Sequence, residues 1–116
     1  MITGVTELSV SVSVEDREGG PRTTVHLVGE ADVTTRALAE VLAAEAAKKP
    51  GLLLVDISGL TFIDSAALHQ LVQAHRRLRA DGGRLELVGP TQPVARILQL
   101  SAIDQVIPVR SSADPS

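Results

Sequence analysis

The stretch that decides the fold is Val55-Asp56-Ile57-Ser58-Gly59-Leu60-Thr61-Phe62-Ile63-Asp64-Ser65-Ala66-Ala67-Leu68. An unbroken apolar run, residues 52–55, enters it, as expected of a strand that is covered on both faces in a parallel sheet. Apolar residues at helical spacing leave it from Leu68 onward. We therefore predict a strand, a short connection and a helix, with Asp64 and Ser65 side by side where the helix begins.

The side chain of Ser65 is expected at the surface. A hydroxyl at the start of a helix lies outside the core, close to backbone N–H groups without helical partners and to the positive end of the helix dipole. Such a serine is accessible to phosphorylation. An Asp-Ser pair before a helix is also an ordinary helix cap, so the pair by itself leaves both interpretations open.

The chain before this stretch predicts two strands and a helix. Four apolar residues alternate with polar ones, as is typical of a strand with one wet face: Leu8, Val10, Val12 and Val14. A polar turn over residues 16–21 and a strand over residues 23–28 follow, so the two strands are expected to pair antiparallel. The first helix is expected to be capped by Asp32 or Thr34 and to end before Pro50-Gly51.

The sequence after Ser65 predicts a second helix, which ends at Asp81-Gly82-Gly83. A strand over residues 84–88 follows, and then a short helix with Pro93 in its first turn. A last strand over residues 106–109 is expected at a sheet edge, because Pro108 cannot donate a hydrogen bond. The order β-β-α-β-α-β-α-β predicts a single α/β domain over residues 1–110, with a mixed, mostly parallel sheet flanked by helices. The polar residues 111–116 are predicted to be a disordered tail.

Composition restricts the class of protein. The 116 residues suit one domain with one core, and Phe62 is the only aromatic residue, so the base-stacking surface of a single-strand nucleic-acid binder is absent. A net charge of -3 gives no reason to expect a nucleic-acid or membrane partner. The chain has no cysteine, no apolar stretch long enough to span a bilayer and no signal-peptide pattern at its start, so we expect a cytoplasmic protein.

Ser65, with Asp64 beside it and His69 one helical turn away, raises the question of a hydrolase. A nucleophilic serine needs a base that is itself oriented by a third group, and an oxyanion site. Residues 64 and 65 point in different directions, and the Gly-x-Ser-x-Gly elbow is absent. His69 and His75 fall on different helix faces, which disfavours a metal pair. We therefore expect no enzyme activity, no catalytic residue, no metal and no cofactor.

Two segments together resemble a STAS domain, the fold of the bacterial anti-sigma factor antagonists. One is Gly29-Glu30-Ala31-Asp32, and the other runs from Asp56 to Leu68. In the family the longer segment reads approximately Asp-x-Ser-x-Leu-x-Phe-Ile/Met-Asp-Ser-Ser/Thr-Gly-Leu. The residues that match it in order are Asp56, Ser58, Leu60, Phe62, Ile63, Asp64, Ser65 and Leu68. The resemblance covers residues 8–109 and implies the same mixed α/β fold.

The resemblance implies a function in transcription regulation by partner switching, as in stress responses. Antagonists of this family bind an anti-sigma factor that is also a serine kinase and so release the sigma factor. The kinase binds the ATP and phosphorylates the serine after the aspartate, which maps to Ser65, and a phosphoserine phosphatase resets it. Phosphorylation adds nearly two negative charges beside Asp64, which an interface fitted to a neutral hydroxyl must desolvate and separate.

The resemblance also implies which residues meet the partner: Asp32, Phe62, Asp64, Ser65, Ala66, Ala67 and His69. Of the apolar pair Phe62-Ile63, one side chain is expected in the core and the other at the surface, and Asp56 and Ser58 are expected to satisfy backbone groups. The chain departs from the family where Ala66-Ala67 replaces Ser/Thr-Gly and where His69 replaces a small residue. These departures leave an alternative open, a scaffold or ligand-sensing module without a phosphorylation switch. Whether the first strand forms a homodimer contact is also open.

Overall fold

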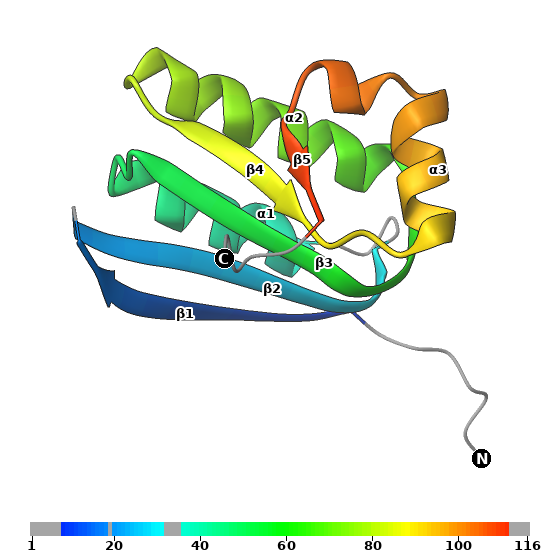
Figure 1. Ribbon diagram of the computed structural model, residues 1–116, viewed down its shortest axis with the longest axis horizontal. Coiled ribbons are helices and arrows are strands. Elements are labelled where there is room, and N and C mark those ends of the chain that lie inside the picture. Colours follow the sequence, from blue (N-terminus) through cyan, green and yellow to red (C-terminus); the bar gives the residue numbers. More distant parts are fainter. Residues whose placement is uncertain (1–7, 19, 32–35, 112–116) are drawn as a thin grey trace.

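The computed structural model describes residues 8–18, 20–31 and 36–111. One five-stranded sheet runs through it in the spatial order β1-β2-β3-β4-β5 (Figure 1). The strands are β1 (Ser9–Arg17), β2 (Gly20–Ala31), β3 (Leu52–Ile63), β4 (Arg84–Val88) and β5 (Val109–Arg110). The β1 and β2 strands pair antiparallel, and every later pair is parallel. The predicted mixed, mostly parallel α/β fold is therefore confirmed.

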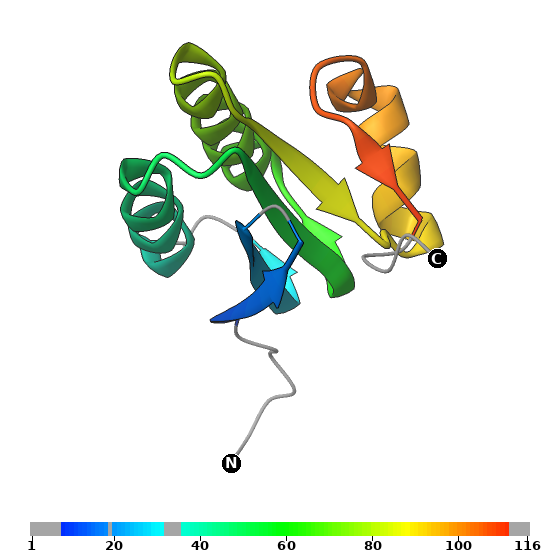
Figure 2. The same cartoon turned by 60° about the vertical axis from the view of Figure 1, so that its left-hand side comes forward.

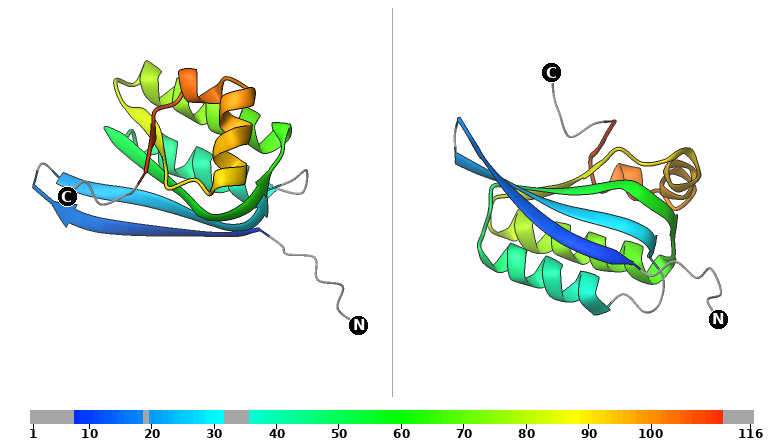
Figure 3. Two further views of the ribbon diagram at one scale, coloured as in Figure 1. Left: turned by 45° about the vertical axis from the view of Figure 1, so that its right-hand side comes forward. Right: turned by 90° about the horizontal axis from the view of Figure 1, so that it is seen from below.

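The helices lie in two places around the sheet. The α1 helix (Arg36–Ala47) and the α2 helix (Ser65–Ala80) lie side by side behind the sheet in Figure 1. The α3 helix (Gln92–Leu100) and the short 3-10 turn η1 (Ile103–Gln105) stand apart from them, beside β5 (Figure 2). Among the described elements, no helix covers the opposite face of β1 and β2 (Figure 3). This face is called the open face below.

The core fills the space between the sheet and the helices with aliphatic side chains. Fully or almost fully buried members include Val25, Leu27, Leu38, Leu42, Leu53, Val55, Ile57, Leu71, Leu78, Leu85 and Leu87. Burial of apolar surface contributes roughly 25 cal/mol per Å² to the free energy of folding. These aliphatic side chains therefore hold the helices against the sheet. The only aromatic residue, Phe62, is 43% exposed and takes little part in this core.

The β3 strand is longer than the sequence predicts. Its apolar run 52–55 was expected to end before Asp56, but the strand continues to Ile63 and leaves only Asp64 as the connection to α2. The prediction of a loop there is wrong because β2 runs beside β3 as far as Ala31, with two register irregularities on the way. Gly59 permits this close approach, since a Cβ atom on it would lie 2.9 Å from Val28 Cγ2 and 3.2 Å from the Leu27 carbonyl oxygen.

Three further boundaries differ from the prediction, the first being that β2 continues to Ala31 rather than ending at residue 28. The expected turn over residues 16–21 is tighter, because the β1–β2 ladder continues to the pair Arg17–Gly20. The last strand is the two-residue β5 rather than residues 106–109, because η1 occupies the preceding segment and Ile107 is fully buried. The predicted edge position of this strand is confirmed. The predicted helix caps Asp32 and Thr34, and residues 112–116 of the predicted tail, lie outside the described residues.

Candidate functional site

The junction of β3 and α2 is built around Asp64. Its backbone is extended, with φ -103° and ψ 177°, so it ends the strand and precedes the helix. Its carboxylate Oδ1 accepts a hydrogen bond from Ala67 N at 2.9 Å, and its carbonyl oxygen accepts one from Leu68 N at 3.0 Å. Asp64 is therefore the N-cap of α2, as predicted, and Ser65 is the first residue of the helix.

The first two turns of α2 present three side chains to the surface. Ser65, Ala66 and His69 are exposed, and they lie on the side of the helix that faces away from the sheet. The expectation that Ala67 belongs to a partner-binding surface is wrong, because its side chain is fully buried in the core. The reason is the helical period: residues 67, 68 and 71 follow the buried stripe, and Ser65 does not.

The electrostatic environment of Ser65 has two opposing parts. The first turn of α2 contains no acidic residue, so the positive end of the helix dipole faces the hydroxyl without a counter-charge from within the helix. Asp64 supplies the one neighbouring carboxylate in the sequence, and that carboxylate is held in place by its hydrogen bond to Ala67 N. A phosphate at Ser65 would meet both the attraction of the dipole and the repulsion of Asp64.

The end of β3 adds an apolar side chain to this surface. Ile63 is 2% exposed and Phe62 is 43% exposed, which confirms that one of the pair enters the core and the other does not. Glu30 lies directly beside Phe62 in the β2–β3 ladder, a neighbour that the sequence motif does not predict. The motif Gly29–Asp32 contains Glu30. Its contact with Phe62 could not be predicted, however, because β3 was expected to end at residue 55 and so not to reach Phe62. Asp32 itself lies outside the described residues.

Two threonines attach this end of β3 to its neighbours. Thr61 Oγ1 donates to the Gly29 carbonyl oxygen at 3.3 Å, which ties β3 to β2. Thr91 Oγ1 donates to the Leu60 carbonyl oxygen at 3.2 Å, which ties β3 to the start of α3. The surface around Ser65 therefore rests at the carboxyl end of a strand that is held on both sides, where open α/β sheets commonly place their binding sites.

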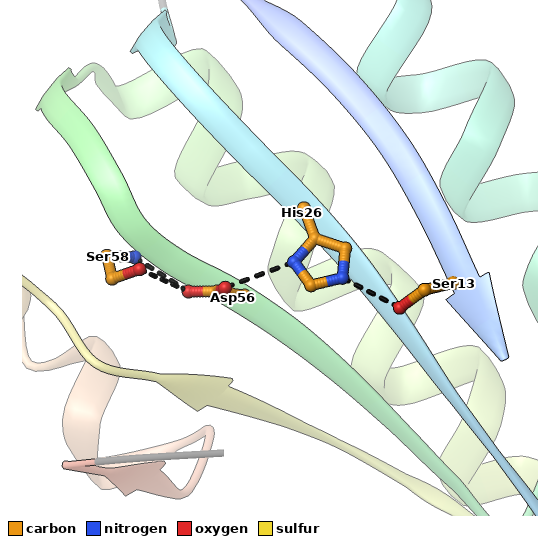
Figure 4. A network of polar contacts seen from close by, with 4 residues as sticks. All are labelled: Ser13, His26, Asp56 and Ser58. Carbon is orange, nitrogen blue, oxygen red and sulfur yellow. Dashed lines mark hydrogen bonds and ion pairs between the residues drawn. The ribbon is translucent and has the colours of Figure 1, made fainter. Parts of the chain in front are cut away.

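A second group of polar side chains lies in a row on the open face of the sheet (Figure 4). The Ser13 Oγ to His26 Nε2 distance is 2.7 Å, and His26 Nδ1 lies 3.1 Å from Asp56 Oδ2. Asp56 Oδ1 accepts hydrogen bonds from Ser58 N at 3.0 Å and Ser58 Oγ at 2.7 Å. Asp56 thus satisfies a backbone N–H group, as predicted, and the row joins β1, β2 and β3.

These contacts fix the ionisation of Asp56. Partial burial would raise the pKa of Asp56, but the hydrogen bonds from Ser58 and the contact with His26 outweigh it and hold this pKa below its ordinary value. An ionised carboxylate only accepts hydrogen bonds, so His26 Nδ1 donates to it. In the neutral ring, Nε2 then accepts from the Ser13 hydroxyl.

The row has the order serine, histidine, carboxylate of a hydrolase. It lies on a sheet face, whereas hydrolases need a concave pocket and oxyanion donors. Two hollows among the described residues lie between α1 and α2, with a volume of about 200 Å³, and between α3 and Val109. Neither is lined by Ser13 or His26. We interpret the row as a structural connection across three strands.

The other two histidines, His69 and His75, lie on different faces of α2, as predicted. His69 is exposed, whereas His75 is 7% exposed and its Nδ1 accepts a hydrogen bond from Leu85 N at 3.1 Å. The ring of His75 is therefore buried, and its hydrogen bond holds the start of β4 against α2. Its burial, with the nearby charge of Arg79, lowers the pKa of His75. No group of metal-ligating side chains was found among the described residues, and none of their helices is long and apolar enough to cross a membrane.

Comparisons with known proteins agree with this geometry. A model of the STAS domain matches residues 12–114. A protein of Mycobacterium tuberculosis, Rv2638, provisionally named an anti-anti-sigma factor, is 34% identical over 93 residues, which are 78% of this chain and 63% of that protein. The crystal structure of an anti-sigma factor antagonist from Mycobacterium paratuberculosis superposes with a TM-score of 0.77 and 28% identity, over 91% of this chain and 89% of that one.

A more distant structure shares the fold. The anti-sigma factor antagonist SpoIIAA in its unphosphorylated form has a TM-score of 0.69 and 21% identity, with 87% of each chain covered. The match to the family model extends over most of the sequence, and the β3–α2 junction has the geometry that the sequence motif predicts. The chain therefore belongs to the STAS domain family.

Proposed function

We propose that this protein is an anti-sigma factor antagonist whose binding is controlled by phosphorylation of Ser65. Unphosphorylated, it binds an anti-sigma factor that is a serine kinase and so releases a sigma factor. The kinase, which carries the ATP, phosphorylates Ser65 and ends the complex, and a phosphatase restores it. This chain contributes the substrate serine and the docking surface and performs no catalysis.

The observation that carries the proposal is the position of Ser65. It is an exposed residue at the start of α2, directly after a capping aspartate, and exposed Phe62, Ala66 and His69 surround it in sequence. A kinase must reach the hydroxyl from solvent, and this hydroxyl lies at the surface. The names of the related proteins Rv2638 and the M. paratuberculosis antagonist support the same class of function.

The switch follows from charge. A phosphoserine carries nearly two negative charges at neutral pH, and Asp64 lies next to it in the chain. A partner surface fitted to a neutral serine would have to desolvate these charges, and a like-charge contact of this kind costs several kcal/mol. Phosphorylation is therefore expected to release the partner without any rearrangement of the fold.

The departures from the family motif carry unequal weight. The methyl group of Ala67 is buried, so it adds nothing to the surface that a partner meets. Ala66 and His69 are exposed and change that surface directly. We expect them to affect which partner is recognised rather than whether Ser65 can be reached.

The test is a quantitative binding experiment with four purified baits in a lysate of the source bacterium. The baits are the wild type, Ser65→Ala, Ser65→Glu and Gln73→Glu. Gln73 is exposed on α2 but lies two turns away, so Gln73→Glu adds one negative charge to the same helix without touching the site. We expect the wild type, Ser65→Ala and Gln73→Glu to recover an ATP-binding kinase, and Ser65→Glu to lose it.

Phosphorylation is tested separately with the recovered kinase and ATP. Mass spectrometry should find one phosphoryl group on the wild type, located at Ser65, and none on Ser65→Ala. Equal recovery of the partner by all four baits would show that charge at Ser65 does not control binding. The protein would then be the scaffold that the sequence left as the alternative.

A further inference from the structure

The β1 strand forms an open edge of the sheet. Within the described part of the chain, β1 pairs with β2 only, so its other side presents backbone N–H and C=O groups to solvent. Natural proteins usually protect such an edge with a lysine, a proline or a bulge. Residues 9–14 contain no charged residue and no proline, and the β1–β2 ladder runs through nine consecutive pairs without a register shift.

The same strand carries valine side chains that its own helices do not cover. Val12 is 41% exposed and Val14 is 60% exposed, although they face the same side of the sheet as the buried Val25. Valine is favoured in strands because it packs against neighbours on a pleated surface, and these two lack a neighbour on the outer side. The edge thus offers both unpaired backbone groups and uncovered apolar surface.

We infer that two copies of this chain form a dimer by antiparallel pairing of their β1 strands, which joins the two sheets into one. The sequence pattern identifies a second copy as the occupant, because the alternation Ser-Val-Ser-Val-Ser-Val complements itself when it is reversed. In an antiparallel pair, opposite residues face the same side of the sheet, so valine must lie opposite valine and serine opposite serine.

One register satisfies this condition over the longest overlap. With Val12 on the twofold axis, Val10 lies opposite Val14 of the second copy, and Ser11 lies opposite Ser13 of the second copy. At the ends, Glu15 lies opposite Ser9, so no two like charges meet. Moving the axis to Ser13 would place Val10 opposite Asp16, and moving it to Ser11 would leave Val14 outside the paired part of β1.

The oligomeric state tests the inference first. Sedimentation of the purified wild type should show a monomer–dimer equilibrium that depends on concentration, and Val12→Lys should raise the dissociation constant about ten-fold or more, because two lysines would meet on the axis. Val14→Lys places its charge opposite Val10 and should act in the same direction. Circular dichroism of both variants checks that they fold. Leu100, at the end of α3, is 80% exposed, and Leu100→Lys is the matched control that should leave dimerisation unchanged.

The absence of cysteine permits a direct test of the register. Under oxidising conditions Val12→Cys should form a covalent dimer, whereas Leu100→Cys should not. A wild type that stays monomeric at high concentration would overturn the inference, as would a dimer that tolerates Val12→Lys and does not cross-link through Val12→Cys. In the first case a strand of another protein becomes the candidate occupant. The inference stands apart from the proposed switch, because Ser65→Glu should leave the dimer intact.

Discussion

Replacing Asp64 separates the two roles that this residue has at the start of α2. Asp64→Ala removes the hydrogen bond from Ala67 N to Oδ1, which is 2.9 Å long, and leaves the first turn without its side-chain cap. Loss of an N-cap acceptor costs typically about 1 kcal/mol of stability. For a domain of this size that is a fall in melting temperature of about 5 °C. Thermal and urea unfolding, followed by circular dichroism, measure both quantities.

Asp64→Asn is the control for this prediction. Asparagine keeps an oxygen that accepts the hydrogen bond from Ala67 N but removes the charge, so its unfolding free energy should fall by only a few tenths of a kcal/mol. If Asp64→Asn destabilises the protein as much as Asp64→Ala, the carboxylate acts through its charge and not as a cap. If neither variant changes the melting temperature, the cap contributes nothing and the derivation of the helix start is wrong.

Three further predictions concern the scaffold that carries this site. The pKa of Asp56 is lower in the folded state than in the unfolded state, so the ionised carboxylate stabilises the fold above about pH 4. This stabilisation is lost as the pH falls through the folded-state pKa. The stability of Asp56→Asn should therefore depend less on pH, in acid unfolding, than the stability of the wild type. Gly59→Ala should destabilise the protein by about 1–3 kcal/mol in urea unfolding, because the added methyl meets Val28 Cγ2 and the Leu27 carbonyl oxygen, whereas Gly51→Ala, with open space around its Cβ position, should not. Leu71→Ala should cost about 2–5 kcal/mol in the same experiment, since Leu71 is fully buried between α2 and the sheet.

Local patterns in the sequence were sufficient for most of the fold. The bounds of β4 match the prediction, Pro93 lies at the start of α3, and α1 ends before Pro50-Gly51. Each of these depends on neighbouring residues alone: an apolar alternation, a proline in the first turn or a pair of helix breakers. The mixed, mostly parallel sheet followed because helices between strands imply parallel crossovers, whereas the order of the strands within the sheet became known only from the structure.

The length of β3 could not be predicted in this way. Residues 56–63 contain Asp, Ser and Gly, which favour turns, and the strand persists there because β2 and Thr91 supply partners from distant parts of the chain. The burial of Ala67 was missed for a related reason, since the helical phase is set by Leu68 and Leu71 against the sheet. Glu30 became visible as a neighbour of Phe62 only once the strand register was known.

The geometry also separates the two interaction surfaces that we propose. Ser65 follows β3, in the middle of the sheet, whereas the β1 edge lies two strands away and ends the sheet on that side. The two surfaces lie on different elements and share no residue, so the free energies of the two associations should be additive. A protein that combines Ser65→Glu with Val12→Lys should therefore lose the kinase and the dimer by the same factors as the single variants. A coupling between the two losses would show instead that the dimer takes part in partner release, with β2 and its Glu30–Phe62 pair as the connection between the two surfaces.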